Sequence, residues 1–244
     1  MTDSPRNTYA DSSRVVAAHQ PTFLPWLGWF DKALRADVLV VLDDVQWPRE
    51  GSGNWMNRVR VLVAGEPRWL TAPVQHAGVQ RVNEVCFDET RPWREKLLRT
   101  LELNYRRAPA FDKMFPLVSG LVSNREPSVA AYNEGNARRL LDALEIDTPL
   151  VRSSELDSSS GGTERLIELT RTADGSVYLS GDGSEGYLDP GTFDGSGVEL
   201  RFQQFSHPQY EQGRAFVPGL SIVDALLRCG LDGTRGLLTT IKRR

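Results

Sequence analysis

Residues 15–44 have the sequence VVAAHQPTFLPWLGWFDKALRADVLVVLDD, in which two apolar runs flank a segment with helical spacing. The first run, Val15 to Ala18, ends in His19, and apolar residues from Leu27 to Leu34 recur at the spacing of one helix face. The second run, Val38 to Leu42, is continuously apolar, as expected of a parallel strand buried on both faces. Strand, helix and strand in this order form a βαβ unit, so the stretch predicts an α/β fold.

The remainder of the chain supplies elements that extend this unit. A turn at residues 64–67 separates two β-rich runs and predicts a hairpin. The patterns then predict, in order, a strand at 79–87, helices at 92–104, 110–122 and 128–144, a loop at 153–163, a helix at 164–172, strands at 177–180 and 198–202, and a last helix at 222–227. Together they predict a mostly parallel, Rossmann-like α/β sheet with an inserted β-hairpin and a helical section. We expect a disordered tail over 1–13, one domain over 14–235 and a basic tail over 236–244.

The composition disfavours several classes of protein. The 29 basic and 32 acidic residues are interspersed and give a net charge of -3, so no sequence-specific nucleic-acid partner is expected. No apolar stretch is long enough for a membrane span, and the first residues lack the apolar core of a signal peptide, which predicts a cytoplasmic protein. Zinc-ligand spacing, HExxH, GxSxG and an EF-hand loop are also absent from the sequence, so neither a metal nor a cofactor is predicted.

Polar residues follow the predicted strands at their carboxyl ends, where ligands bind in such folds. His19 and Gln20 lie in a loop that Pro21 and Pro25 restrict. This position favours His19 as a catalytic residue and Gln20 as a substrate contact. The structural alternative is a histidine whose ring bonds to the backbone of its own loop.

Two adjacent acids, Asp43 and Asp44, end the second strand. Because neighbouring residues of a strand point to opposite sides, only one is expected to face the cleft, and Asp44 is the preferred candidate. Its carboxylate would be a general base, a metal ligand or an acceptor for a substrate amine or hydroxyl, and Asp43 is placed among the substrate contacts. Capping of a turn is the alternative.

Aromatic and basic residues around the first two strands are further candidates. Trp26 belongs to a region rich in tryptophan and could wall a pocket, with core packing as the alternative. Asn57 and Arg58 lie in a strand-like run, where Arg58 and Arg60 share a face and could clamp a carboxylate or phosphate. Solvated surface charge explains the same arginines.

The glycine-rich loop after residues 177–180 has the composition of a phosphate-binding loop without the lysine of a P-loop. Ser180, Gly181 and Tyr187 are its candidate ligand contacts. A plain turn is the alternative.

The last candidates lie near the carboxyl terminus of the sequence. His207 is a second candidate base, with Tyr210 beside it as a substrate contact. Ser221 precedes a helix whose free amides could hold an anion, and an ordinary N-cap explains the same residue. Asp224 either supports the first turn of that helix or points toward the site.

The motif His-Gln-Pro-x-Phe-Leu-Pro-Trp-Leu-Gly at residues 19–28 resembles the WbqC-like protein family, and the likeness runs from residue 15 to residue 230 or so. Further matching positions are Asp43-Asp44, Asn57-Arg58, Trp69-Leu70-Thr71, Tyr178-Leu179-Ser180-Gly181, His207-Pro208 and Leu220 to Asp224. Val59 and Leu97 depart from the family, which often has an asparagine and a histidine there. The family is associated with surface-polysaccharide and other biosynthetic gene clusters, so the resemblance implies group transfer to a small amine or amino-sugar.

A fainter likeness links residues 15–44 to nucleotidyltransferases of the class that includes cytidylyltransferases. This chain lacks their pair of histidines in the first loop and has Trp26 and Trp29 nearby instead. The departure argues against nucleotidyl transfer by their mechanism.

The residues support three hypotheses about function. The first is a biosynthetic transferase or amide-forming enzyme, in surface-polysaccharide or specialised-metabolite biosynthesis, that joins an acyl or aminoacyl group to a small amine. In it, His19 or His207 is the base and Asp44 holds the amine. The alternatives are a nucleotide-dependent enzyme and a non-catalytic ligand-binding scaffold. The expected partners are a small-molecule substrate and an acyl or aminoacyl donor, and a homo-oligomer is left open.

Overall fold

The central sheet has five strands, and all neighbouring strands in it are parallel. The computed structural model describes residues 13–48, 55–184, 188–213 and 215–242. In spatial order the strands are β7 (Leu150–Arg152), β2 (Val38–Val41), β1 (Val15–His19), β8 (Val177–Ser180) and β9 (Glu199–Phe202). This confirms the predicted Rossmann-like α/β sheet.

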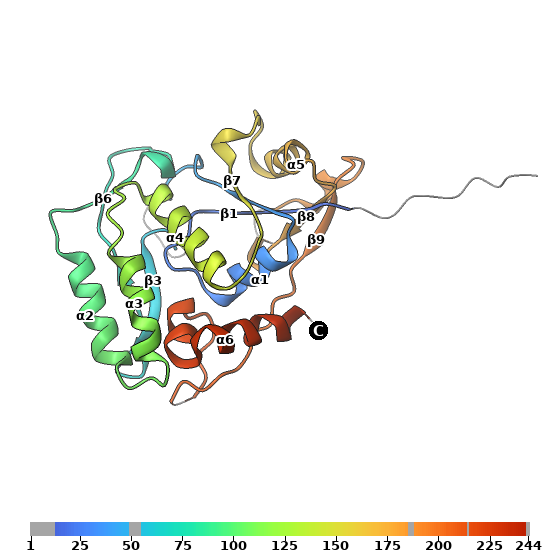
Figure 1. Ribbon diagram of the computed structural model, residues 1–244. Helices are drawn as coiled ribbons and strands as arrows, with labels where there is room; N and C mark the ends of the chain where they lie inside the picture. The colour runs from blue at the N-terminus through green and yellow to red at the C-terminus, as the bar shows by residue number, and fades with distance from the viewer. Residues whose placement is uncertain (1–12, 49–54, 185–187, 214, 243–244) are drawn as a thin grey trace, which may run out of the picture.

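Helices cover both faces of the sheet, which explains why its inner strands are mostly apolar. On β1, Ala17 packs into a core with α1 (Leu27–Arg35), α4 (Val129–Ala143) and α6 (Ile222–Lys242). Its neighbours Val16 and Ala18 face the opposite side and pack against α5 (Gly162–Thr172). Figure 1 shows α1 and α5 on opposite sides of the sheet.

A long insertion separates β2 from β7 and forms a second part of the molecule, beside the sheet (Figure 1). Its strands form two antiparallel pairs, and its helices pack with α6 and α1 into one core. The elements are β3 (Arg58–Val63), β4 (Glu66–Thr71), β5 (Val74–Gln75), β6 (Cys86–Phe87), α2 (Trp93–Tyr105), α3 (Phe111–Val122) and α4. The predicted hairpin and helical section are therefore confirmed, and Ser128 caps α4 as expected.

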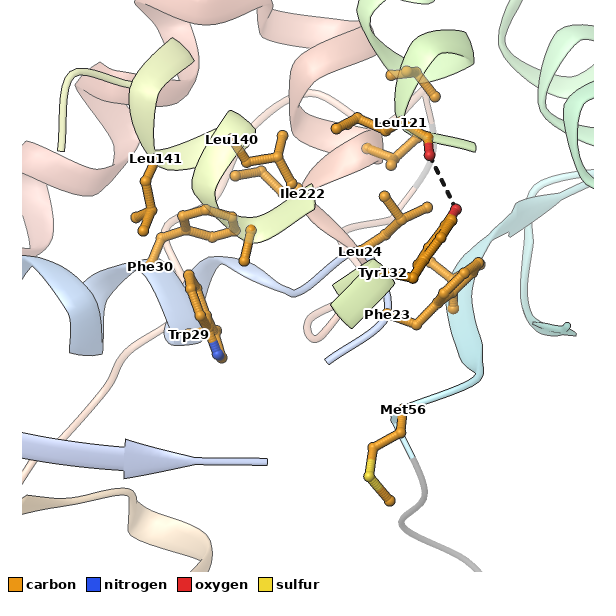
Figure 2. Close-up of a cluster of buried hydrophobic side chains, with 14 of the residues drawn as sticks. Phe23, Leu24, Trp29, Phe30, Met56, Leu121, Tyr132, Leu140, Leu141 and Ile222 are labelled. Carbon is orange, nitrogen blue, oxygen red and sulfur yellow. Dashed lines mark hydrogen bonds between the residues drawn. The ribbon is translucent and has the colours of Figure 1, made fainter. Parts of the chain in front are cut away.

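The loop from β1 to α1 is held by buried aromatic residues. Phe23 is fully buried and its ring stacks on that of Tyr132 with centroids 5.6 Å apart, while the Tyr132 hydroxyl donates to the carbonyl of Leu121 at 3.0 Å. Figure 2 shows Phe30 directed toward Leu140 of α4, whereas Trp29 points away from that helix. The loop that carries His19 is thus anchored to the core on one side.

The strand order places a topological switch point between β1 and β8. The chain runs from β1 through β2 to β7 on one side, then returns to form β8 and β9 on the other side of β1. In open parallel sheets, connections that leave in opposite directions open a crevice at the carboxyl ends of the two strands. The carboxyl ends of β1 and β8 are His19 and Ser180.

Several predicted boundaries were wrong. Strand β7 was not predicted, because three residues are too few for a recognisable pattern. Residues 79–87 contain a 3-10 turn at Val82–Glu84 and only the two-residue strand β6. The last helix continues past residue 227 to Lys242, with a kink at Gly230, where φ is +70°. Part of the predicted basic tail, residues 236–242, is therefore helical.

No helix in the described part of the chain combines the length and the apolar character that a membrane crossing needs.

Candidate active site

A cavity of about 730 Å³ opens at the switch point between β1 and β8. Its volume lies within the usual range of small-molecule sites. The residues that line it include ones from the end of β1, the first turns of α1, the segment before β3, the start of the glycine-rich loop after β8 and the loop after β9. It is therefore built where the fold places ligand sites.

His19 lines this cavity and has a defined tautomer. Its Nδ1 lies 2.9 Å from the carbonyl oxygen of Gln20 and 3.2 Å from Oγ1 of Thr22. The Thr22 hydroxyl donates its own proton to the Gln20 carbonyl at 3.0 Å, so it acts as an acceptor toward His19. The two oxygens near Nδ1 are therefore both acceptors, which places the ring proton on Nδ1. The second ring nitrogen, Nε2, is left with an unshared electron pair. Sequence reasoning offered catalysis and a backbone bond as alternatives, and the ring makes the backbone bond through one nitrogen while keeping the other unprotonated.

Loss of hydration keeps the His19 ring uncharged. Burial and, secondly, the charge of Lys32 lower the pKa of His19 to about 3, against the opposing effect of the bond to Gln20. The imidazole is therefore neutral at pH 7.

Lys32 of α1 also lines the cavity, although it was not singled out from the sequence. The residue is buried, and its amine lies against the backbone of Gly181, just after β8. If residue 181 had a Cβ, that atom would lie only 2.9 Å from the lysine Nζ. Within the described residues, no carboxylate oxygen lies within 4.0 Å of this nitrogen. Burial lowers the pKa of Lys32 to about 8, and the more distant Asp182 partly counteracts this effect.

Aromatic side chains form the walls. The rings of Trp26 and Trp55 lie 4.7 Å apart between centroids, and Trp26 meets His19 edge to face at 5.4 Å. Phe205, from the loop after β9, lines the cavity as well. These three half-buried rings offer flat apolar surface beside the polar groups.

The loop after β9 is fixed in place by hydrogen bonds that converge on the cavity. Gln203 is buried, and its Nε2 donates to the Gly28 carbonyl and to Oδ2 of Asp31, at 2.7 Å in each case. Asp182 accepts from the backbone amides of Gln204 and Phe205, at 2.7 Å in each case. The carboxylate of Asp182 thus positions the Phe205 wall.

Five residues proposed from the sequence line the cavity together: His19, Gln20, Trp26, Ser180 and Gly181. Tyr187, proposed with them, lies outside the described residues.

Asp43 and Asp44 lie at the end of β2 and do not line this cavity. Asp43 accepts hydrogen bonds from Ser153 and Ser154, and Asp44 accepts from Ser153 and is paired with Arg165. The expectation that the two acids point to opposite sides was wrong, because both lie in a turn beyond the strand and both contact Ser153. Burial tends to raise the pKa of Asp44, but the bonds from Ser153 and Arg165 and the charge of Arg165 hold it below its usual value.

The proposed pair on the hairpin also has partners within the protein. Asn57 is buried and its Nδ2 donates to the carbonyl of Ala72 at 2.8 Å. The guanidinium of Arg58 lies over the ring of Trp69, 4.4 Å from its centroid. Trp69 in turn meets Trp55 edge to face at 4.6 Å, so Arg58 adjoins the cavity only through two aromatic rings.

His207 has the opposite tautomer to His19. The amide of Gly219 donates to its Nδ1 at 3.4 Å, which places the ring proton on Nε2. The ring packs edge to face on Phe205 at 4.7 Å and supports that wall from outside the cavity. Burial and the charge of Arg60 lower the pKa of His207.

Tyr210 and Asp224 belong to a buried network. The carboxylate of Asp224 accepts from the hydroxyls of Tyr105 at 2.7 Å and Tyr210 at 2.9 Å, and Arg228 Nε lies 3.2 Å away. The Tyr105 hydroxyl also accepts from the amide of Leu62 at 2.9 Å. Asp224 is completely buried and does not reach the cavity.

Ser221 joins distant parts of the chain at the start of α6. Its hydroxyl donates to the carbonyl of Leu24 at 2.7 Å and accepts from the amide of Val223 at 3.2 Å. The amide of Ile222 donates to Pro25 and that of Asp224 to Ser221. These three amides have protein acceptors, so they are not available to an anion as the sequence suggested, and the N-cap alternative describes this residue.

Sequence reasoning missed Lys32, Gln203 and Phe205 as cavity residues. One available signal was helical spacing, because Lys32 lies one turn after Gly28 and Trp29 on the face of α1 that reaches the cavity. Among the described residues, no group of three or more histidine, cysteine or acidic side chains is placed to hold a metal ion.

A second cavity of about 620 Å³ lies between β4 and α2 and is lined by Trp69, Thr71, Lys96 and Leu97. Leu97 is one of the two departures from the resembled family. The other, Val59, is buried in the core. Both departures therefore leave the lining of the switch-point cavity unchanged.

Comparison with known proteins identifies the chain's relatives. The profile of the WbqC-like protein family matches residues 20–235. The chain is 30% identical over 230 residues to the uncharacterized protein Rv1507c of Mycobacterium tuberculosis, and the match covers 90% of this chain and 95% of that protein. No solved structure matches the chain. The chain therefore belongs to the WbqC-like protein family.

Proposed function

We propose that the protein is a biosynthetic transferase that joins an acyl or aminoacyl group to a small amine, and that the switch-point cavity is its active site. The observation that carries this proposal is the neutral His19 in the cavity, with its proton fixed on Nδ1 and its Nε2 unprotonated. A neutral imidazole beside a ligand-sized cavity can accept a proton, and its lowered pKa makes it a weak base in the empty cavity.

The reaction requires one proton acceptor at the attacking nitrogen. The amine nitrogen forms a bond to the acyl carbon, and Nε2 of His19 takes the proton that the nitrogen loses. The bond to the leaving group then breaks, and the same proton passes from His19 to that group. The fixed Nδ1 proton and its bonds to Gln20 and Thr22 hold the ring in one orientation through both transfers.

His19 is a better candidate for this role than His207 or Asp44. His207 carries its proton on Nε2 and lies behind Phe205, outside the cavity lining. Asp44 is engaged by Ser153 and Arg165. We therefore assign neither the proton transfer nor the holding of the amine to Asp44.

The test is product formation by the purified protein. Panels of small amines and activated acyl or aminoacyl esters are incubated with the native chain, and new amides are identified by mass spectrometry. His19→Ala should lower the rate by roughly 100- to 10,000-fold while the circular dichroism spectrum is preserved. His76→Ala is the matched control, because His76 is exposed and lies outside the cavity. Unchanged product formation by His19→Ala would overturn the assignment.

A nucleotide-dependent reaction is the second candidate, and the placement of the cavity favours it. Doubly wound sheets bind nucleotides at the switch point, and Trp26 and Trp55 offer faces on which a base could stack. Stabilisation against heat by a nucleoside triphosphate with magnesium would support this candidate. No shift with any common nucleotide would count against it. A non-catalytic scaffold accounts less well for a polar lining that includes His19, Lys32 and Ser180.

A further inference from the structure

Lys32 brings a positive charge into a place where the protein does little to stabilise it. Only 7% of the residue is exposed, and its Nζ rests against the backbone at Gly181. Removing an ammonium group from water is unfavourable unless an opposite charge lies close by. Charged side chains are therefore rarely buried alone unless a ligand is bound there.

The acids around Lys32 in the described residues are engaged elsewhere. Asp182 holds the backbone amides of Gln204 and Phe205 and lies more than 4.0 Å from Nζ. Asp31, the preceding residue on α1, is bonded to Arg35 and Gln203. Among the residues that the structure describes, Lys32 has no direct counter-ion, although it lines a cavity large enough for a ligand.

We infer that the switch-point cavity takes a substrate with an anionic group, a carboxylate or a phosphate, and that Lys32 binds this group at the backbone of Gly181. A Cβ at position 181 would lie 2.9 Å from Nζ, so a larger residue there would push the end of the Lys32 side chain away from the backbone. This inference names the charge class of the substrate and rests on the proposed function for its location in an active site.

The remaining lining indicates what the anionic group is attached to. The rings of Trp26, Trp55 and Phe205 present apolar surface in the same cavity. We assign to the site a small molecule with a ring or another apolar part at these walls and the anion at Lys32. A bound anion would also offset the effect of the Lys32 charge on His19, so the proton acceptor would become a stronger base when substrate is present.

Matched probes of one shape and different charge test this inference. Benzoate, phenyl phosphate and the neutral benzamide are titrated against the full chain, and binding is followed by the fluorescence of the tryptophans at the cavity. One of the anions should bind roughly 10- to 100-fold more tightly than benzamide, as expected for a hydrogen bond to a charged group. Tighter binding of benzoate indicates a carboxylate substrate, and tighter binding of phenyl phosphate indicates a phosphate.

Three variants separate the role of Lys32 from other effects. Lys32→Met keeps the apolar stem and should abolish the preference for the anion, whereas Lys32→Arg should retain most of it. Gly181→Ala should weaken anion binding with the charge still present. His19→Asn should keep the preference even though it removes turnover, so this inference and the proposed function can fail separately.

Three results would overturn the inference. The first is equal binding of benzamide and both anions, and the second is no binding of either anion at millimolar concentration. The third is a preference for the anion that survives Lys32→Met.

Discussion

Two buried charged residues in this protein, Asp224 at the start of α6 and Lys32 on α1, differ in the partners that surround them. Asp224 receives hydrogen bonds from Tyr105 and Tyr210 and an ion pair from Arg228, all within 3.3 Å. Lys32 has no carboxylate within 4.0 Å among the described residues and opens on a cavity. A buried charge whose partners are all internal holds the fold together, whereas one that lacks partners at a cavity marks a place for a ligand.

Removal of the satisfied charge should have the largest effect on stability. Asp224→Ala leaves two tyrosine hydroxyls and Arg228 without their acceptor, so the free energy of unfolding should fall by about 3–5 kcal/mol, measured by urea denaturation. Asp232→Ala on the same helix is the control, because that side chain is exposed and should change stability by less than about 0.5 kcal/mol. A loss below about 1 kcal/mol for Asp224→Ala would break the comparison.

Removal of the unsatisfied charge should have the opposite sign. The pKa of Lys32 falls from 10.5 to about 8 on folding, so the unfolded chain binds more protons between these values and stability rises with pH there. Below pH 8 the full cost of burying the charged amine lowers stability. Lys32→Met removes this cost and should raise the free energy of unfolding at pH 7 by about 1–3 kcal/mol. The gain should shrink as the pH approaches 10.5. Urea denaturation at pH 7 and above pH 9 measures both values, and a less stable Lys32→Met at pH 7 would contradict the prediction.

The smallest expected effect concerns a single bond within the Asp224 network. Tyr210→Phe removes one of several donors to the carboxylate and should cost about 0.5–1.5 kcal/mol in urea denaturation. Tyr105→Phe should cost more, because the Tyr105 hydroxyl also accepts from the amide of Leu62. If Tyr210→Phe lowered the free energy of unfolding as much as Tyr105→Phe or more, the second bond of the Tyr105 hydroxyl would contribute nothing to stability.

The parallel sheet could be predicted from the sequence because its strands leave clear local patterns. The apolar runs at Val38–Val41 and Val177–Ser180 are buried on both faces and read as strands without further information. Strand β7 lies at the edge of the sheet and has only three residues, too few for a pattern. The last helix was cut short because Gly230 and the glycines after it weaken helical propensity, although the helix continues to Lys242.

The candidate site was only half predictable, for a different reason. His19 and Ser180 end their strands, so the rule for parallel sheets places them at the crevice. Lys32 and Gln203 reach the same place through tertiary packing of α1 and of a loop, which no local pattern encodes. Asp43 and Asp44 satisfied the rule as well as His19 did, yet neighbouring serines and Arg165 occupy their carboxylates.

The bonds of Ser221 have a consequence for the order in which this protein folds. They tie the loop after β1 to a residue 197 positions later in the chain, and Gln203 reaches back 175 positions to Gly28. Contacts between such distant residues form late, since a long loop must close before they can exist. During synthesis, the first loop leaves the ribosome long before its partners do. The switch-point cavity is therefore among the last features to be completed, and a nascent chain would form it only after its final helix has docked.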